Sequence, residues 1–339
     1  MKIENMWYRR DKRVWLLWPL SLLFRALSAF RRWLYRSGVK PATKVSACVI
    51  VVGNISVGGN GKTPVVIALV EYLKKKGISV GVLSRGYGGN TTHFPHQVQP
   101  INGPDEVGDE PKLIAARTHV PVVIDPKRAR GASYLADKLH CQVIICDDGL
   151  QHYALHRDVE LVVMDNRGVG NGHLLPMGPL REGLWRLDTV HGIIINGDVS
   201  VLDRQITDHD CPVYGMSLAG TDFVNVKSGD RVGVAEFSQQ QNTVALAGIG
   251  NPDRFFSQLS SMGLTLSDTY RYPDHHQFAA KDIPLKTVVM TEKDAVKVTS
   301  FVHDDCWYYP VDAQLPPPFY AFIDTRLTAA GIDLKEDQL

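Results

Sequence analysis

The sequence predicts an α/β protein whose main domain is a doubly wound parallel sheet, followed by a second, smaller α/β domain. Short apolar runs of strand length alternate with segments of helical spacing, which is typical of consecutive β-α-β units. A glycine-rich turn joins one of these strands to the next helix. The chain has 339 residues, of which 44% are hydrophobic and 22% charged, enough for two folded domains.

The expected elements follow the chain in order. An apolar run at residues 45–52 predicts a buried strand, and residues 65–76 have the spacing of a helix. Further strands are expected at residues 79–83, 120–124, 143–146, 159–165, 192–196, 244–247 and 287–290, and further helices at 111–118, at 128–140 and ending near residue 262. A charged pair precedes the strand at residue 159, so we expect the domain boundary at residues 153–158 and domains at 41–155 and 156–339.

Residues 1–40 predict an amphipathic membrane helix. Eleven Lys and Arg residues lie within the first 45 positions, against only Glu4 and Asp11. The apolar run at residues 14–24 is shorter than the ~20 residues that cross a bilayer, so it cannot span alone. Beyond it, one helical face carries Phe24, Leu27, Phe30, Trp33 and Leu34, and the other Arg25, Ser28, Arg32 and Arg36. This pattern is typical of a helix in the membrane interface, with a core-packed helix and a cleaved signal peptide as the alternatives.

Charge and cysteine usage exclude several classes of protein. The net charge of +1 gives no general attraction to nucleic acid. Five scattered cysteines lack the paired short spacings of a zinc site, so we expect buried thiols in a reducing compartment.

The glycine-rich turn predicts a phosphate-binding P-loop for ATP. It comprises Gly58, Gly59, Asn60, Gly61, Lys62, Thr63 and Pro64 between the expected strand and helix. In such a loop the lysine reaches the β- and γ-phosphates, and the Thr63 hydroxyl ligates Mg²⁺. The usual spacing would place glycine at position 56, where this chain has Ser56. A glycine-rich turn with an incidental lysine is the alternative.

Acidic residues at strand ends predict where the metal lies. Asp147 and Asp148 follow the strand at residues 143–146, as a Walker B carboxylate does, although such a pair also suits a plain turn. The long connection at residues 84–110 contributes Asp109 and Glu110. Residues alone leave Asp109, Glu110 and Asp147 as equal candidates for a general base. The Gly248-Ile249-Gly250 segment indicates a tight turn rather than a second nucleotide site.

Seven segments in this order resemble tetraacyldisaccharide 4'-kinase, the lipid A 4'-kinase of Gram-negative bacteria. They are residues 53–64, 84–88, 108–111, 147–152, 171–176, 274–275 and 291–297. The irregular loop with Ser56 belongs to that family's pattern. The resemblance implies a P-loop NTPase-like domain that transfers the γ-phosphoryl group of ATP to the 4'-hydroxyl of a tetraacyldisaccharide 1-phosphate. It also implies Mg²⁺, a lipid acceptor at the cytoplasmic face of the inner membrane, no nucleic acid and no obligate protein partner.

The resemblance further implies roles for single residues. Asp109 is the base, assisted by His275 from the second domain, and the two can stand apart in an unliganded protein because the domains close. Lys62, Arg85 and Arg128 contact transferring or substrate phosphate, with solvated surface charge as the alternative for each arginine. Gln151 and His152 line the nucleotide site, and the metal candidates are Thr63, Asp147, Asp148 and Glu110.

Two other functions compete with the kinase. A membrane-associated P-loop switch ATPase also combines such a loop with an amphipathic helix, but its signature lysine before the two glycines is Val57 here. A nucleotide-binding regulator without catalysis would require Asp109 or His275 to lie far from the γ-phosphate.

Overall fold

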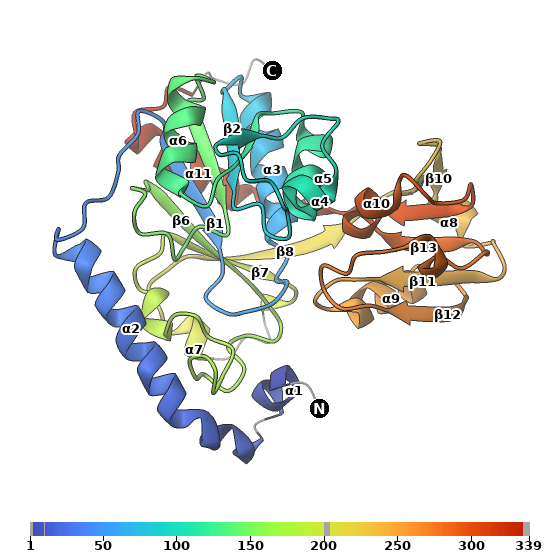
Figure 1. Ribbon diagram of the computed structural model, residues 1–339, viewed down its shortest axis with the longest axis horizontal. Coiled ribbons are helices and arrows are strands. Elements are labelled where there is room, and N and C mark those ends of the chain that lie inside the picture. Colours follow the sequence, from blue (N-terminus) through green and yellow to red (C-terminus); the bar gives the residue numbers. More distant parts are fainter. Residues whose placement is uncertain (1–2, 10, 200–203, 335–339) are drawn as a thin grey trace. The chain divides into compact units, whose positions relative to one another are not determined.

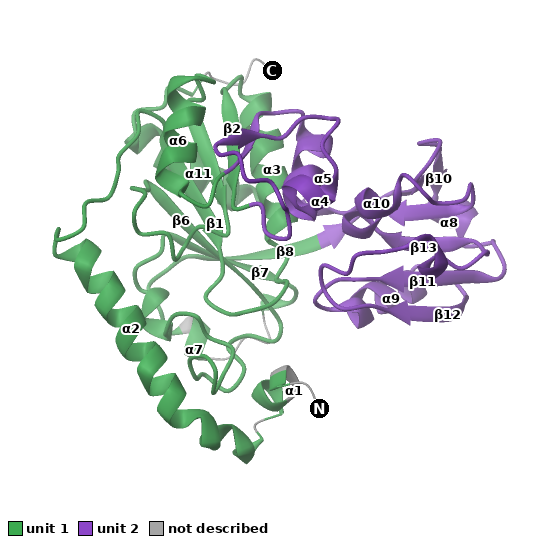
Figure 2. Ribbon diagram, in the orientation of Figure 1, with its two compact units in different colours: residues 1–85, 125–217, 314–339 green, residues 86–124, 218–313 purple. Residues whose placement is uncertain are grey.

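The computed structural model describes residues 3–9, 11–199 and 204–334, and it divides into two compact units (Figure 2). Unit 1 comprises Met1–Arg85, Asp125–Ser217 and Gln314–Leu339. Unit 2 comprises Gly86–Ile124 and Leu218–Ala313. Each unit is therefore assembled from segments that are far apart in the sequence.

Unit 1 is built on a parallel sheet (Figure 1). Its strands are β1 (Cys48–Gly53), β2 (Val80–Ser84), β5 (Val143–Asp147), β6 (Val159–Asp165), β7 (Gly192–Asn196) and the first part of β8 (Val213–Ala219). Their order is β8-β7-β6-β1-β5-β2, and every pairing is parallel. Strands β1, β2, β5, β6 and β7 are buried along their whole length, which explains why they read as continuous apolar runs.

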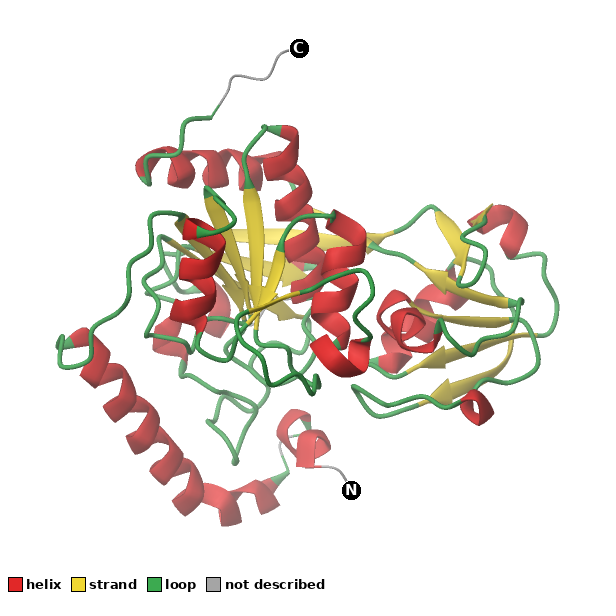
Figure 3. Cartoon of the chain, turned by 45° about the horizontal axis from the view of Figure 1, so that its top comes forward, coloured by secondary structure: helices red, strands yellow, loops and turns green. Residues whose placement is uncertain are grey.

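Helices flank this sheet (Figure 3). They are α3 (Lys62–Lys75), α6 (Arg128–Asp137) and α11 (Pro317–Ala329), with the short α7 (Arg204–Thr207) and η2 (Leu184–Arg186) between strands. Helix α3 contacts β1, and α6 contacts β2 and β5. Tyr72 of α3 donates a hydrogen bond of 2.8 Å to Asp324 of α11, which fixes the last helix of the unit against α3.

Unit 2 contains a mixed sheet of order β10-β9-β14-β13-β11-β12. Its strands are β9 (Asp222–Asn225), β10 (Arg231–Gly233), β11 (Thr243–Ala247), β12 (Leu266–Arg271), β13 (Val288–Thr291) and β14 (Cys306–Tyr309). Strands β12, β11, β13 and β14 pair in parallel, whereas β9 and β10 are antiparallel. The helices that follow these strands are α8 (Val234–Phe237), α9 (Pro252–Ser261), η4 (Ala280–Asp282) and α10 (Glu292–Val298).

The earlier segment of unit 2 supplies one helix pair to this second fold. It carries β3 (His96–Gln97), α4 (Pro104–Val107), α5 (Asp109–Thr118) and β4 (Val122–Ile124). Helix α5 packs against α10. Stacked aromatic rings, including Phe223 on Phe237 at 4.2 Å between centroids, fill the core of the sheet. The chain leaves unit 2 through β15 (Asp312–Gln314).

The strands predicted at residues 159–165 and 192–196 have those bounds, and the other predicted elements lie within a few residues of the observed ones. All five cysteines are buried and unpaired, as expected. The division into units differs from the predicted boundary at residues 153–158. The reason is strand pairing: β6 pairs with β1 and β7 with β6, so the chain beyond residue 156 continues the sheet of the loop domain.

The N-terminal segment is helical, as predicted. It comprises α1 (Ile3–Tyr8), the 3-10 helix η1 (Lys12–Leu17) and α2 (Trp18–Arg36), which continues η1 without a break. Trp7, Val14 and Met177 form a small buried cluster, so the start of the chain packs on the loop that follows β6.

Candidate active site

The turn between β1 and α3 has the backbone of a phosphate-binding loop. Gly58 and Gly61 have φ angles of +109° and +89°, a left-handed region that other residues rarely adopt. Gly61 also lacks room for a side chain, because a Cβ atom would lie 2.5 Å from the side-chain nitrogen of Asn196, the last residue of β7. Helix α3 then begins with Lys62, Thr63 and Pro64. The free N–H groups of this first turn make the loop a natural anion site.

Ser56 stands where a glycine is usual because its hydroxyl closes the base of the loop. Asn60 is only 3% exposed, and its side-chain nitrogen donates to the Ser56 hydroxyl at 3.1 Å and to the Val163 carbonyl at 3.4 Å. The Asn60 carbonyl accepts a hydrogen bond of 3.3 Å from Asn196. The loop is thereby anchored to the ends of β6 and β7, and its strand–loop–helix context agrees with the prediction.

The two aspartates after β5 have different surroundings. Asp147 is buried at the end of the strand, whereas Asp148 is partly exposed in a left-handed conformation, with φ +49°. The ammonium of Lys62 lies 3.7 Å from Asp148, and the Arg181 guanidinium binds the same carboxylate at 3.0 Å. Burial raises the pKa of Asp148, but Lys62 and Arg181 outweigh it and lower the pKa overall. The carboxylate is therefore ionised at neutral pH, next to the loop lysine.

Arg128 is a buried guanidinium with incomplete hydrogen bonding. Its side chain begins α6 and is 3% exposed, and Nη2 donates to the Asp147 carbonyl at 2.8 Å. Its Nε and Nη1 atoms have no hydrogen-bond partner among the described residues. Burial lowers the pKa of Arg128, and the neighbouring charge of Arg85 acts in the same direction. Burial, with the charges of Arg128 and Arg85, also lowers the pKa of His152 to about 4, so this histidine is neutral.

Gln151 joins the loop after β5 to the loop after β1. Its side-chain nitrogen donates to the Asn54 carbonyl at 3.2 Å and to the Glu182 carboxylate at 2.9 Å. The Tyr153 hydroxyl donates to the same glutamate. These bonds fix the edge of the sheet at which Lys62 and Asp148 meet.

Asp109 and His275 are hydrogen-bonded to each other within unit 2. Asp109 lies in the first turn of α5 and is 6% exposed, and Nδ1 of His275 lies 3.1 and 3.0 Å from its two oxygens. The hydrogen bond with Asp109 raises the pKa of His275. We expected the pair to come from two domains, a division that would have allowed the two residues to stand apart without ligand. Instead one unit holds both residues in contact, because α5 belongs to the fold that carries residue 275.

Two lysines of α10 flank this pair. Lys297 lies 3.6 Å and Lys293 lies 3.8 Å from the Asp109 carboxylate. Burial raises the pKa of Asp109, but the hydrogen bond to His275 and the two ammonium groups outweigh it and lower the pKa to about 2. Lys293 also binds Glu110 at 2.9 Å and Asp274 at 3.3 Å. Lys293 thus links the Asp109 carboxylate to the carboxylates of Glu110 and Asp274.

The predicted site residues therefore form two groups. Unit 1 holds the phosphate loop and the residues around it: Lys62, Thr63, Arg85, Arg128, Asp147, Asp148, Gln151 and His152. Unit 2 holds Asp109, Glu110 and His275. Among the described residues, no three His, Cys, Asp or Glu side chains are arranged to hold a metal ion by themselves. Thr63 with Asp147 and Asp148 nevertheless offers the hard oxygen donors that Mg²⁺ prefers when phosphates and water complete its shell.

Sequence reasoning missed four residues that the geometry brings into these groups. Arg181 binds Asp148, Lys293 and Lys297 flank Asp109, and Arg167 contacts the phosphate loop. The lysines lie in the segment at residues 291–297, which the resemblance includes without giving them a role. The spacing of four residues between the two lysines could have indicated that both lie on one face of a helix.

One face of α2 exposes a row of large apolar side chains. The exposed large apolar residues of η1 and α2 are Trp15, Leu16, Trp18, Leu20, Leu22, Leu23, Leu27, Phe30 and Trp33. The helical stretch Lys12–Arg36 is long and apolar enough to cross a membrane, and 11% of its apolar window is buried. A helix packed on the protein's own core is therefore excluded for this segment. Phe24 and Leu34, predicted on the apolar face, are half-buried instead.

The opposite face of α2 is bound to the body of unit 1. Ser21 donates to the Leu174 carbonyl at 2.9 Å, and the Arg32 guanidinium lies 3.4 Å from the centre of the Trp185 ring. Tyr35 contacts Tyr153 with ring centres 6.1 Å apart. The helix is thus held near both of its ends.

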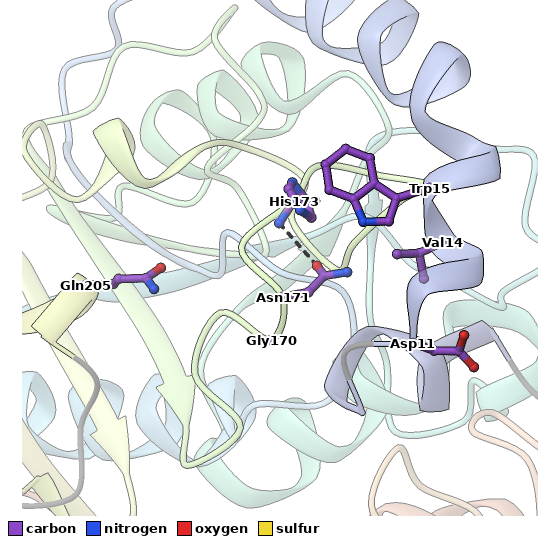
Figure 4. A pocket seen from close by; sticks show the side chains of 7 residues that line it. All are labelled: Asp11, Val14, Trp15, Gly170, Asn171, His173 and Gln205. Carbon is purple, nitrogen blue, oxygen red and sulfur yellow. Dashed lines mark hydrogen bonds between the residues drawn. The ribbon is translucent and has the colours of Figure 1, made fainter.

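A pocket of about 360 Å³ lies between η1 and the loop that follows β6 (Figure 4). Its lining residues are Asp11, Val14, Trp15, Gly170, Asn171, His173 and Gln205. Asn171 accepts a hydrogen bond of 3.2 Å from the His173 backbone, and the Trp15 and His173 rings meet edge to face at 5.7 Å. The loop therefore has defined contacts with η1.

Comparison with known proteins identifies the family. A family model described as tetraacyldisaccharide-1-P 4'-kinase matches residues 13–328. The tetraacyldisaccharide 4'-kinase of Pseudoalteromonas atlantica is 48% identical over 302 residues, covering 89% of this chain and 96% of that one. The Haemophilus influenzae enzyme is 46% identical over 314 residues, covering 91% of each chain.

A solved structure agrees with these relatives. It is the "apo" form of LpxK from Aquifex aeolicus in complex with ATP, with a TM-score of 0.79 and 27% identity, covering 92% of this chain and 99% of that one. The family model covers nearly the whole chain, and the relatives share almost half of its residues. The chain therefore belongs to the tetraacyldisaccharide-1-P 4'-kinase family.

Proposed function

We propose how this chain carries out its family's reaction, the transfer of the γ-phosphoryl group of ATP to the 4'-hydroxyl of a tetraacyldisaccharide 1-phosphate in lipid A biosynthesis. The observation that carries the proposal is the anchored glycine loop that ends in Lys62 at the N-terminus of α3. Such a loop binds the triphosphate through backbone N–H groups. In phosphoryl transfer the protein contributes mainly positioning and electrostatic stabilisation, so the remaining residues are assigned on those terms.

Lys62 and the aspartates after β5 form the triphosphate end of the site. Lys62 exchanges its contact with Asp148 for the β- and γ-phosphates when ATP binds. Thr63, Asp147 and Asp148 hold Mg²⁺, which neutralises the charge that builds up on the phosphates during transfer. Glu110 is bound by Lys293, so we assign this glutamate to the support of that lysine rather than to the metal.

Arg128 and Arg85 bind phosphate of the transferring group or of the lipid. The support is the pair of unbonded nitrogens on the buried Arg128 guanidinium. A buried donor without a partner costs about 1–3 kcal/mol, and a phosphate oxygen removes that cost while gaining a charge-assisted bond. Arg85 is exposed and adds a second positive charge near the same point.

Asp109 accepts the proton of the 4'-hydroxyl, and His275 acts with it as a unit. The carboxylate is ionised at neutral pH because its pKa is about 2. The pKa of His275 is raised by the same hydrogen bond, so a proton that enters the pair comes to rest on the imidazole. This exchange leaves Asp109 ready to orient the next hydroxyl group.

The helix α2 lies in the plane of the interface at the cytoplasmic face of the inner membrane. Its apolar residues face outward, while Ser21 and Arg32 bind the protein body. A helix attached on one side near both ends cannot be surrounded by lipid, as a spanning helix is. The exposed Arg25, Arg31 and Arg36 can contact anionic headgroups, and the acylated acceptor is then presented in the same plane.

Incubation of the purified chain with radiolabelled ATP, Mg²⁺ and tetraacyldisaccharide 1-phosphate in detergent tests the proposal. The expected product is a bis-phosphorylated lipid that carries the label. A switch ATPase would instead release labelled inorganic phosphate, whether or not the lipid is present. That result would overturn the kinase assignment.

A further inference from the structure

An arginine contacts the phosphate loop from the end of β6. Arg167 follows the strand by two residues, and its guanidinium is paired with Asp165 through bonds of 2.9 and 3.0 Å from Nε. The Arg167 backbone N–H also donates to Asp165 at 3.0 Å. Asp165 is almost fully buried, so one fixed carboxylate determines both the backbone and the side-chain direction of this arginine.

The Nη2 end of the guanidinium, which also lies 2.7 Å from Asp165, contacts three consecutive residues of the loop. Its Nη2 atom donates to the Gly59 carbonyl and to the Asn60 side-chain oxygen, each at 3.2 Å. A Cβ atom built on Gly58 would lie 3.5 Å from both terminal nitrogens, which places the group in contact with the top of the loop. Arg167 therefore supports the loop from outside, while Ser56 and Asn60 close it from within.

This contact fixes the direction of one backbone N–H group. In a trans peptide the carbonyl and the following N–H point in opposite directions. Since Arg167 holds the Gly59 carbonyl, the Asn60 N–H points away from the guanidinium and cannot rotate freely. The loop contains three glycines, which have unusually large conformational freedom, so such a restraint reduces the entropy lost when a triphosphate is bound.

The N-terminal segment covers the same guanidinium. The Tyr8 ring of α1 lies 5.5 Å from the centre of the Arg167 guanidinium, a cation–π distance. A Cβ atom on Gly170 would lie 3.2 Å from the Tyr8 ring, so the ring is held against the loop that follows β6.

We propose that Arg167 is a positioning residue for ATP, which holds residues 58–60 in the phosphate-binding conformation and is itself held by Asp165 and Tyr8. The proposal rests on the function proposed above, in which this loop binds ATP. Arg167 acts through the loop rather than on the transferring group. Its loss therefore weakens ATP binding and leaves the lipid acceptor unaffected.

Titration of the full-length protein with MgATP in detergent tests this role. We expect Arg167→Met to raise the Kd for MgATP about tenfold, the effect of losing bonds made by a charged donor, with the KM for the lipid unchanged. Arg167→Lys keeps the positive charge but loses the planar guanidinium with its several N–H donors. Its Kd for MgATP should therefore lie between those of the wild type and Arg167→Met. Arg326→Met, an exposed arginine of α11, is the matched control and keeps the wild-type Kd.

Two further measurements separate positioning from a general loss of structure. Hydrogen exchange in residues 57–61 becomes faster in Arg167→Lys, while the Tm stays near that of the control because the lysine still balances the buried Asp165 carboxylate. Tyr8→Leu raises the Kd by a smaller factor, and Tyr8→Phe, which keeps the ring, leaves it unchanged. If Arg167→Met fails to fold, the same measurements on Arg167→Lys, Tyr8→Leu and Tyr8→Phe test the proposal.

The outcomes distinguish this proposal from the one on which it rests. Lys62→Ala serves as the reference: if it binds ATP as tightly as the wild type, the loop is not the ATP site and both proposals fail. If Lys62→Ala weakens binding and Arg167→Met does not, only the role of Arg167 is overturned. A fall in kcat with an unchanged Kd would also overturn it, because the arginine would then act on the reacting phosphoryl group.

Discussion

Replacing Arg128 with methionine should separate stability from activity. Arg128→Met keeps most of the side-chain volume and removes a buried charge with two unbonded nitrogens. Loss of those orphaned donors gains about 1–3 kcal/mol, and loss of the bond to the Asp147 carbonyl costs about 1.5–3 kcal/mol. The two terms nearly cancel, so the free energy of unfolding should change by no more than about 2 kcal/mol.

Activity should respond very differently. If the two nitrogens bind phosphate, their loss should lower kcat/KM roughly a hundredfold, which corresponds to about 2.7 kcal/mol of transition-state stabilisation. Thermal unfolding and initial-rate kinetics on the same preparation measure both effects. A Tm shift of at most about 8 °C is expected, at 2–4 °C per kcal/mol for a unit of this size.

A neighbouring arginine provides the control. Arg130 on the same helix makes an ion pair of 2.7 Å with the fully buried Asp125 carboxylate. Arg130→Met removes a partner from a buried charge, so it should lower the Tm more than Arg128→Met does while leaving kcat/KM unchanged. The reasoning is refuted if Arg128→Met lowers the Tm by more than about 10 °C and keeps kcat/KM within about threefold of the wild type.

Three further predictions concern the loop, the Asp–His pair and the helix. Lys62→Ala should reduce kcat/KM by a factor on the order of 10² or more with an unchanged melting curve, and unchanged activity would remove the loop from the reaction. Alanine substitutions of Asp109 and His275 should each lower single-turnover rates strongly, and the double variant should lose little more, whereas fully multiplicative losses would mean separate roles. Because the pKa of His275 is raised, its imidazole gains a proton at a pH above the ordinary histidine value of 6.5, and activity should fall on acidification from that pH. Asp109→Asn removes the negative charge that raises this pKa, so the acidic fall in activity should shift to lower pH. Serine at the exposed positions Leu23, Leu27 and Phe30 should release the protein from membranes in sedimentation assays, while high salt alone should release the wild type only partly.

Much of the fold could be predicted because five parallel strands of unit 1, β1, β2, β5, β6 and β7, are buried along their whole length. Strands β6 and β7 have the predicted bounds, since a fully buried strand leaves an uninterrupted apolar run between polar turns. The division into units could not be predicted in the same way. It depends on which strands pair and on which helices pack together, and no periodicity reports the packing of α5 on α10.

The candidate site shows the same limit. The phosphate loop is contiguous, so its residues are adjacent in the sequence and in space. The contact between Asp109 and His275 joins residues that are 166 positions apart, and only the family resemblance paired them. Arg167 and Lys297 act through contacts with residues more than 100 positions away, and their positions along the chain give no sign of it.

The order of synthesis gives the discontinuous units a further consequence. Unit 1 is complete only when α11, from the last segment of the chain, has been made and Asp324 can bind Tyr72 and Lys76. The ribosome releases α2 long before that, so the apolar helix is available to the membrane while the sheet still lacks its final helix. Membrane attachment can therefore precede folding of the catalytic body, and the surface on which the lipid arrives can be occupied before the enzyme is able to act on it.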